Sequence, residues 1–189
     1  PCGVSTKKNI NNDFNSAILS DKKSSFGGIV AINRKITKQI ANNLINNFYS
    51  VIISPHIPDK IRNKLNIKKN LLLIEYTNNQ RLLEYEIKNV DGGYIKQIKN
   101  NKKIIYKNIK CVSKKTVTKK MLNDIIFSMK VCKHVKSNAI VVVKNMQTIG
   151  IGAGQMSRVD SVKLAIKKKN ENFKNINSFV AASDGFFPF

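Results

Sequence analysis

The sequence predicts an α/β protein, because short runs of apolar, β-branched residues alternate with longer segments in which apolar residues recur at helical spacing. Residues 51–53 and 139–143 are such strand-length runs, and residues 36–48 and 118–135 carry the helical pattern. The composition agrees with a folded domain, since 42% of the 189 residues are hydrophobic and 24% are charged. One domain with a real core is therefore expected.

The N-terminal part of the chain is expected to alternate helices and strands. A short helix is expected at 13–20, and a strand at 26–33 follows a Ser-Ser turn. Thr37 is the expected N-cap of a helix whose apolar face consists of Ile36, Ile40, Leu44, Ile45 and Phe48. The series continues with a buried strand at 51–53, a shorter helix after Pro58 with Ile61 and Leu65, and a buried strand at 71–74.

The middle of the chain has weaker patterns until a long helix begins at Thr118. Residues 82–87, together with Gly92 and Gly93, indicate an edge segment, and residues 94–113 indicate irregular β structure. The long helix has one expected core stripe, made of Met121, Leu122, Ile125, Ile126, Met129, Cys132 and Val135.

A hairpin followed by a glycine segment is the most constrained part of the sequence. Residues 139–143 and 148–151 are the expected strands, with a turn at 144–147. Gly150, Gly152 and Gly154 alternate with Ile151 and Ala153, which lets a ligand or another backbone approach closely. Ser157 is expected to cap a helix with Val159, Val162, Ala165 and Ile166 at helical spacing.

This glycine segment does not match the common nucleotide-binding motifs. Its pattern is G-x-G-x-G, whereas the dinucleotide fingerprint is G-x-G-x-x-G and a P-loop requires a Walker lysine. The spacing leaves two interpretations open, a ligand-binding loop and a purely structural tight turn.

The formal net charge of +23 raises the question of nucleic-acid binding. Only four of the 34 basic residues are arginines, and the lysines occur as scattered pairs without interleaved aromatic residues. Biased composition explains this pattern, so no specific nucleic acid is expected as a partner, only salt-sensitive association with polyanions. A basic nucleic-acid-binding module remains an alternative function.

Cysteines and apolar runs indicate a cytoplasmic protein without a metal site. Cys2, Cys111 and Cys132 are too few and too scattered for a disulfide framework, and no run approaches the ~20 apolar residues of a membrane span. Pro1-Cys2-Gly3 resembles half of a zinc-deaminase signature, but Ser5 occupies the second cysteine position and no H-x-E is present. Cys132 and His134 do not share a helix face, so a buried cysteine and an exposed histidine are expected.

Four blocks in the same order resemble the formyltransferase half of the bifunctional purine biosynthesis proteins. The blocks are Pro1-Cys2-Gly3-Val4; Ser24-Ser25-Phe26-Gly27-Gly28-Ile29-Val30-Ala31; Lys136-Ser137-Asn138-Ala139 with the segment from Ile149 to Arg158; and Ala182-Ser183-Asp184-Gly185-Phe186-Phe187-Pro188-Phe189. The resemblance spans the chain and is faint from about His56 to Lys120.

The resemblance implies a cytidine-deaminase-like three-layer α/β fold without zinc, with a first unit and part of a second in this chain. Residues 1–189 would form a partial formyltransferase domain, with the cyclohydrolase domain and both ends of the transformylase domain outside it. The implied reaction transfers a formyl group from 10-formyltetrahydrofolate, a reduced folate, to aminoimidazole carboxamide ribotide. The implied assembly is a homodimer with active sites across its interface. An inactive dimerisation domain is a further alternative.

The family's site residues carry over to nine positions. The expected substrate-binding residues are Gly27, Ser50, Asn138 and Phe186, and the expected folate-binding residues are Phe26, Arg158, Val159, Pro188 and Phe189. Ser50 stands where relatives often carry an acidic contact. The catalytic Lys-His pair is expected just upstream of Pro1, so no catalytic base is assigned within the chain.

Overall fold

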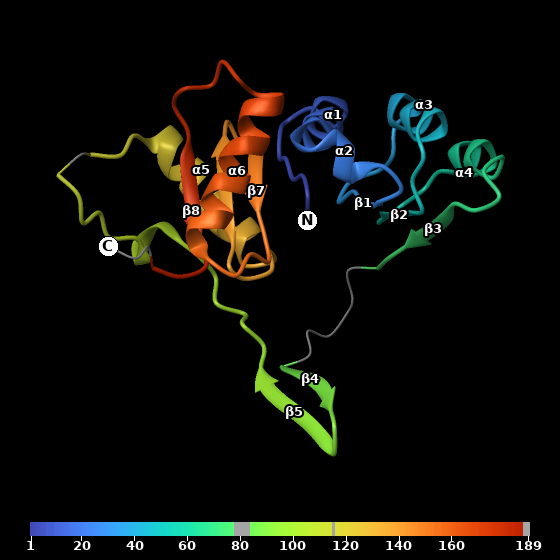
Figure 1. Cartoon of the computed structure of the whole chain (residues 1–189). Coiled ribbons are helices and arrows are strands. Elements are labelled where there is room, and N and C mark those ends of the chain that lie inside the picture. Colours follow the sequence, from blue (N-terminus) through green and yellow to red (C-terminus); the bar gives the residue numbers. More distant parts are fainter. Residues whose placement is uncertain (78–83, 115, 187–189) are drawn as a thin grey trace.

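The computed structural model describes residues 1–77, 84–114 and 116–186, which form two three-stranded sheets and a separate hairpin (Figure 1). In chain order the elements are α1 Ile10–Ser20, α2 Lys22–Ser25, β1 Ile29–Ala31, α3 Lys38–Asn46, β2 Val51–Ser54, α4 Asp59–Leu65, β3 Leu72–Glu75, β4 Tyr85–Val90, β5 Gly93–Ile98, the 3₁₀ helix η1 Tyr106–Asn108, α5 Lys119–Cys132, β6 Ile140–Lys144, β7 Gln147–Gly152, α6 Arg158–Asn172 and β8 Val180–Ser183. The predicted α/β class is confirmed, with both parallel and antiparallel pairing.

The N-terminal sheet has the strand order β1-β2-β3, and all of its strands run parallel. Each crossover contains a helix, α3 between β1 and β2 and α4 between β2 and β3. Thr37 caps α3 as expected, because its side chain accepts the Ile40 N–H. The expected strand at 26–33 is shorter in the structure, where the residues before Ile29 form a turn around Gly27.

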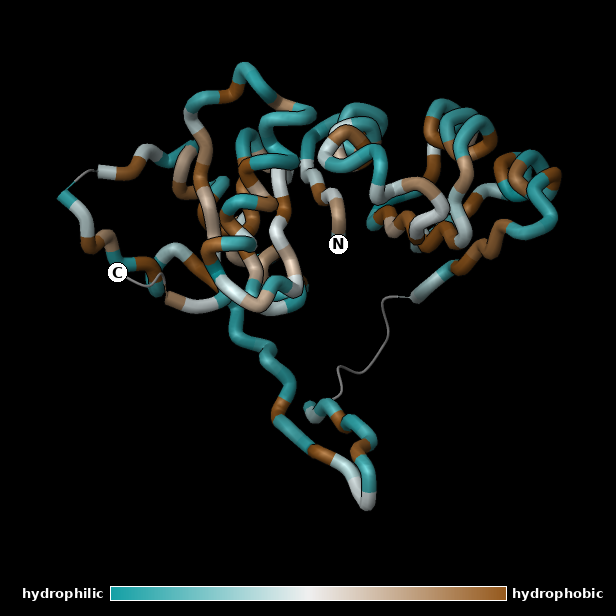
Figure 2. Tube along the Cα trace, viewed as in Figure 1, coloured by the Kyte–Doolittle hydropathy of each residue, from teal (hydrophilic) through white to brown (hydrophobic). Residues whose placement is uncertain are grey.

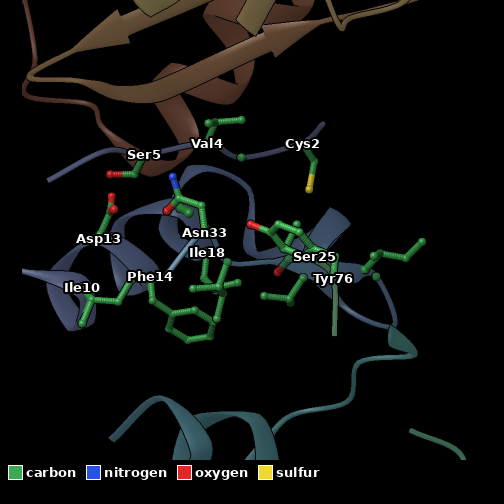
Figure 3. Close-up of a pocket in the computed structure, with 17 residues that line it drawn as sticks. Cys2, Val4, Ser5, Ile10, Asp13, Phe14, Ile18, Ser25, Asn33 and Tyr76 are labelled. Atoms are coloured by element: carbon green, nitrogen blue, oxygen red, sulfur yellow. The ribbon is translucent and has the colours of Figure 1, made fainter. Parts of the chain in front are cut away.

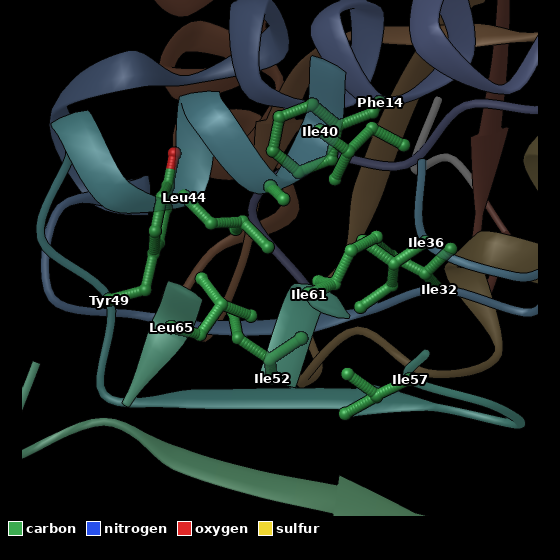
Figure 4. Close-up of a cluster of buried hydrophobic side chains, with 11 residues drawn as sticks. Phe14, Ile32, Ile36, Ile40, Leu44, Tyr49, Ile52, Ile57, Ile61 and Leu65 are labelled. Atoms are coloured by element: carbon green, nitrogen blue, oxygen red, sulfur yellow. The ribbon is translucent and has the colours of Figure 1, made fainter. Parts of the chain in front are cut away.

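Helices α1, α3 and α4 cover one face of this sheet with a single apolar cluster. Figure 4 shows Phe14 from α1, Ile40 and Leu44 from α3, and Ile61 and Leu65 from α4 converging on the sheet. The opposite face is different, since Ile29, Leu72 and Ile74 are exposed. The expectation of a buried strand at 71–74 was therefore wrong for the outward side chains, because none of the described helices covers that face.

The hairpin β4–β5 extends away from both sheets (Figure 1). Its residues are exposed throughout, and apolar and polar residues are interspersed along it (Figure 2). The edge segment expected at 82–87 lies partly outside the described residues, and its described part joins β4. The irregular β structure expected at 94–113 is confirmed only as far as Ile98.

The C-terminal sheet has the order β7-β6-β8, and β6 runs antiparallel to both neighbours. Helix α5 packs on one face, through Phe127 and Val131, and α6 packs on the other, through Ala165. Helix, sheet and helix therefore form three layers, with the strands of the expected hairpin almost fully buried.

The expected core stripe of α5 was partly wrong. Met129 is 38% exposed, whereas Asp124, Phe127 and Val131 are buried. The buried face includes the carboxylate of Asp124, which accepts backbone N–H groups at the turn between β6 and β7. A buried polar group needs such partners, and periodicity of apolar residues does not reveal it.

The N-terminal segment joins the two sheets. Thr148 of β7 donates its N–H to the Val4 carbonyl at 2.9 Å and accepts the Val4 N–H on its hydroxyl at 2.9 Å. Helix α1 also packs on β7, and Lys168 of α6 pairs with Asp21 at 2.6 Å. Within the described part of the chain, no helix combines the length and apolar character needed to cross a membrane.

Candidate functional site

The glycine segment after the hairpin is shaped by the packing of α6 on β7. A Cβ atom at Gly150 would lie 2.1 Å from the Ala165 carbonyl oxygen, and one at Gly152 would lie 1.9 Å from that of Ser161. The structural interpretation therefore holds for these two glycines, since a helix backbone occupies the space beside them. Gly154 has a φ of +66°, a conformation that glycine adopts without steric cost.

Asn138 lies between α5 and β6, beside the end of the glycine segment. Its side-chain nitrogen donates to the carbonyl oxygens of Gln155, at 2.9 Å, and Met156, at 3.0 Å. Its side-chain oxygen accepts a hydrogen bond from Arg158 Nη2 at 3.0 Å. The Ser137–Asn138 peptide is cis, and the Asn138 carbonyl accepts the Ser161 hydroxyl at 2.7 Å. The amide group is thus held on both of its ends.

Arg158, the first residue of α6, connects Asn138 with the end of β8. Its Nη1 donates to the Ser183 hydroxyl at 2.8 Å and to the Asp184 carboxylate. Burial alone would raise the pKa of Asp184, but hydrogen bonds from Ser137, Arg158 and the Ala139 N–H, together with the Arg158 charge, lower this pKa to about 2. Asp184 is therefore ionised at neutral pH, and we call Asn138, Arg158, Ser183 and Asp184 the Asn138 cluster.

Apolar side chains stand open to solvent next to this polar cluster. Val159 is 52% exposed and Phe186 is 83% exposed. Val159 is one of the apolar residues expected at helical spacing in α6, and the helix turns its side chain outward. Pro188 and Phe189 lie outside the described residues.

The remaining expected residues form a second group, here called the Gly27 group, at the start of β1 and β2. Gly27 has a φ of +69° and donates its N–H to the Phe48 carbonyl at 2.9 Å. The Ser50 hydroxyl donates to the Gly27 carbonyl at 2.7 Å. The Phe26 and Phe48 rings lie 5.4 Å apart, and Phe26 is 74% exposed. This group therefore also combines a fixed backbone turn with an open aromatic surface.

A cavity of about 390 Å³ lies beside the Gly27 group, between the N-terminal segment, α1 and β1 (Figure 3). Ser25 and Gly28 line it, and the side-chain oxygens of Ser5 and Asp13 point toward one another across its edge. Neither Ser5 Oγ nor Asp13 Oδ1 has a hydrogen-bond partner among the described residues. The Asp13 carboxylate is balanced by Arg34 through its other oxygen.

The structure brings the expected residues together in two groups rather than one, because they belong to different sheets. Sequence reasoning missed three residues that complete these groups, namely Phe48, Ser183 and Asp184. Ser183 and Asp184 belong to a block used for the resemblance, but no local pattern links them to Arg158, which lies 26 positions before Asp184. Among residues 1–77, 84–114 and 116–186, no cluster of histidine, cysteine and acidic side chains suited to a metal ion is found.

The arrangement favours ligand binding over proton transfer. Planar and apolar ligand groups fit the exposed side chains of Val159, Phe186 and Phe26, while Arg158 supplies a fixed positive charge. Both histidines lie outside the two groups: His56 contacts Glu75 at 3.4 Å, and His134 is exposed after α5.

The structure defines a mixed α/β protein in which the segment before β6, the start of α6 and the end of β8 converge on a candidate site. The family model of the AICARFT/IMPCHase bienzyme matches residues 1–168. The chain belongs to the AICARFT/IMPCHase bienzyme family.

Curated relatives match the chain along its whole length. The bifunctional purine biosynthesis protein PurH of Aquifex aeolicus is 40% identical over 189 residues, that of Thermoanaerobacter sp. is 41% identical, and that of Fusobacterium nucleatum is 42% identical. Each alignment covers 100% of this chain. The chain spans 36–37% of the length of these relatives.

Proposed function

We propose that this chain is part of an enzyme that transfers the formyl group of 10-formyltetrahydrofolate to the 5-amino group of aminoimidazole carboxamide ribotide, in the biosynthesis of inosine monophosphate. The observation that carries the proposal is the Asn138 cluster, in which the family motif residues Asn138 and Arg158 bond directly at 3.0 Å. Membership of the bienzyme family favours this function over a basic nucleic-acid-binding module or an inactive dimerisation domain.

In this proposal the Asn138 cluster and the Gly27 group each contribute contacts to both substrates. Asn138, Phe186, Gly27 and Ser50 contact the ribotide, while Arg158, Val159 and Phe26 contact the folate, joined by Pro188 and Phe189. A general base is still required, because the aromatic amine of the ribotide is a weak nucleophile. The proposal places that base in a Lys-His pair preceding Pro1 in the complete protein, by which we mean the full translation product of the gene.

We propose further that the enzyme is a cytoplasmic homodimer of cytidine-deaminase-like units, with cyclohydrolase activity in other parts of the complete protein. The two site groups lie on different sheets of one chain. In the proposed dimer each active site takes the Gly27 group from one subunit and the Asn138 cluster from the other. The β7-β6-β8 sheet between α5 and α6 supports a three-layer unit.

The test measures formyl transfer by the complete protein with both substrates. Turnover of the ribotide is expected, and the isolated 189-residue chain is expected to show none, because the proposed base is not among its residues. A folded complete protein that binds neither substrate would refute the assignment.

The shared site is tested by mixing two variants whose activity is strongly reduced. Gly27→Val disrupts the Gly27 group, because a β-branched residue is strained at a φ of +69°. Arg158→Ala removes the guanidinium from the Asn138 cluster. Mixed dimers regain one intact site if the subunits share it. If a mixture transfers formyl groups no faster than either variant alone, the proposal of a shared site is contradicted. That result would not bear on the proposed reaction.

A further inference from the structure

We propose that Asp184 is a positioning residue, which holds Arg158 against Asn138 so that the guanidinium stays in place for the incoming cosubstrate. This inference rests on the proposed function. It assigns a role to a residue that the carry-over of family site residues left without one.

The Asp184 carboxylate joins three segments that are distant in sequence. It accepts the Ala139 N–H at 3.0 Å before β6, and it accepts Arg158 Nη1 at the start of α6. The Asp184 N–H in turn donates to the Ala139 carbonyl at 3.3 Å. The position of Arg158 relative to Asn138 therefore depends on a residue that follows β8.

The ion pair is well placed to fix the guanidinium. The side chains of Arg158 and Asp184 are only 16% and 21% exposed, so water screens their interaction less than it screens a surface pair. A charge-assisted hydrogen bond in such a place is stronger than a neutral one. Acidic residues are scarce in this chain, 11 against 34 basic residues, which leaves few other partners for Arg158.

Gly185 supplies a second constraint that does not depend on charge. A Cβ atom at Gly185 would lie 2.7 Å from Arg158 Nη2, closer than real Cβ contacts come. The guanidinium thus lies directly against the Gly185 backbone. Gly185→Ala is expected to displace Arg158 while leaving the Asp184 carboxylate intact.

Asp184 acts through Arg158 rather than on the reacting atoms. Its Oδ1 is already used by the Ala139 N–H and by Arg158, and the carboxylate stays ionised at neutral pH. A group that neither gains nor releases protons in this range is unsuited to general acid–base catalysis, but it is well suited to holding a cation.

The kinetic test uses the complete protein with Asp184→Asn, Arg158→Ala and the double variant. Asp184→Asn is expected to raise KM for 10-formyltetrahydrofolate about tenfold, with a smaller change in kcat, since a charge-assisted hydrogen bond to the guanidinium is lost. The double variant is expected to be no worse than Arg158→Ala alone, because both changes remove the same interaction. Glu171→Gln, at the exposed end of α6, is the matched control and is expected to behave as wild type.

Three outcomes would overturn the inference. They are an unchanged KM in Asp184→Asn, full additivity of the two single changes, and a lower Tm with normal kinetics in the folded fraction. Rescue of KM by Asp184→Glu would support it, because the longer side chain keeps the charge.

A structural readout keeps the two proposals separate. A crystal structure of Asp184→Asn is expected to show the Arg158 guanidinium moved away from Asn138, whatever reaction the enzyme catalyses. Arg158 unmoved in that structure would refute the positioning role. Absence of formyl transfer by the wild-type complete protein would instead refute the proposed function.

Discussion

The side-chain oxygen of Asn138 accepts a hydrogen bond from Arg158 Nη2 at 3.0 Å, which links a residue two positions before β6 to the first residue of α6. The other end of the same amide donates to the carbonyls of Gln155 and Met156. Asn138 therefore organises the glycine segment as well as the candidate site, and its replacement affects both folding and binding.

Asn138→Ala is expected to lower the free energy of unfolding by about 1–3 kcal/mol, because two carbonyls and a guanidinium lose a partner. Urea unfolding of the 189-residue chain measures this effect. Asn101→Ala, in an exposed loop, is the control and should stay within about 0.5 kcal/mol of wild type. Equal stability of the two variants would show that the Asn138 side chain contributes nothing to the fold.

Gly152→Ala is expected to destabilise the chain by about 1–3 kcal/mol or more, since overpacking forces α6 away from β7. The added Cβ would meet the Ser161 carbonyl at 1.9 Å. The matched control is Gly93→Ala, where nothing lies within 4 Å of the added atom. The two variants are compared by the shift of their urea unfolding midpoints. A larger shift for Gly93→Ala than for Gly152→Ala would argue against the packing of α6 on β7.

Asp124→Ala is expected to cost about 1–3 kcal/mol, because it leaves two backbone N–H groups without their acceptor. Asp124 accepts the N–H of Met146 at 2.7 Å and that of Asn145 at 3.0 Å. Both residues have positive φ, 51° at Asn145 and 58° at Met146, so this turn depends on outside support. Thermal unfolding tests this expectation by comparing the Tm of Asp124→Ala with that of the control Glu171→Ala. Equal Tm values for the two variants would contradict it.

Asp184 is expected to make the free energy of unfolding depend on pH in the acidic range. Its folded-state pKa of about 2 lies below the ordinary value of 3.8, so its contribution is fully present above the ordinary pKa and is lost as pH falls through the folded value. Asp184→Asn should therefore lose less unfolding free energy than wild type between about pH 4 and about pH 2. Urea midpoints at several pH values measure this, and parallel curves for the two proteins would contradict it.

Cys132 is expected to resist alkylation at pH values where exposed thiols react. Burial raises the pKa of its thiol to about 11, with a further rise from the Asp184 charge and an opposing effect of Arg158. Mass spectrometry after timed iodoacetamide treatment should show Cys111, which is exposed, modified well before Cys132. Modification of Cys132 at the same rate in the folded chain would mean that α5 opens readily.

Local rules predicted the elements whose ends carry their own chemistry. Thr37, Thr118 and Ser157 each cap the helix expected to follow them, because a hydroxyl before a helix needs only nearby N–H groups. The hairpin of residues 139–151 was also predicted, with its turn centred at Asn145 and Met146. Cys132 is buried and His134 is exposed, as expected, although His134 follows the end of α5.

Predictions that depended on neighbours from elsewhere in the chain were less accurate. The outward face of β3 is exposed because the helices over this sheet all lie on its other side. The buried face of α5 includes Asp124, because a turn more than 20 residues later supplies its partners. The local spacing of apolar residues predicts neither of these features.

The sequence by itself determined the α/β class, the helix caps, the hairpin and the motif blocks that indicated the family, since each depends on residues close together in the chain. Only the tertiary structure decided that Gly150 and Gly152 make room for α6, and that Asp184 reaches Arg158. The physical reason is that a Cβ clash or an ion pair depends on distance in space. Residues 26 positions apart meet only after two strands and a helix have packed together.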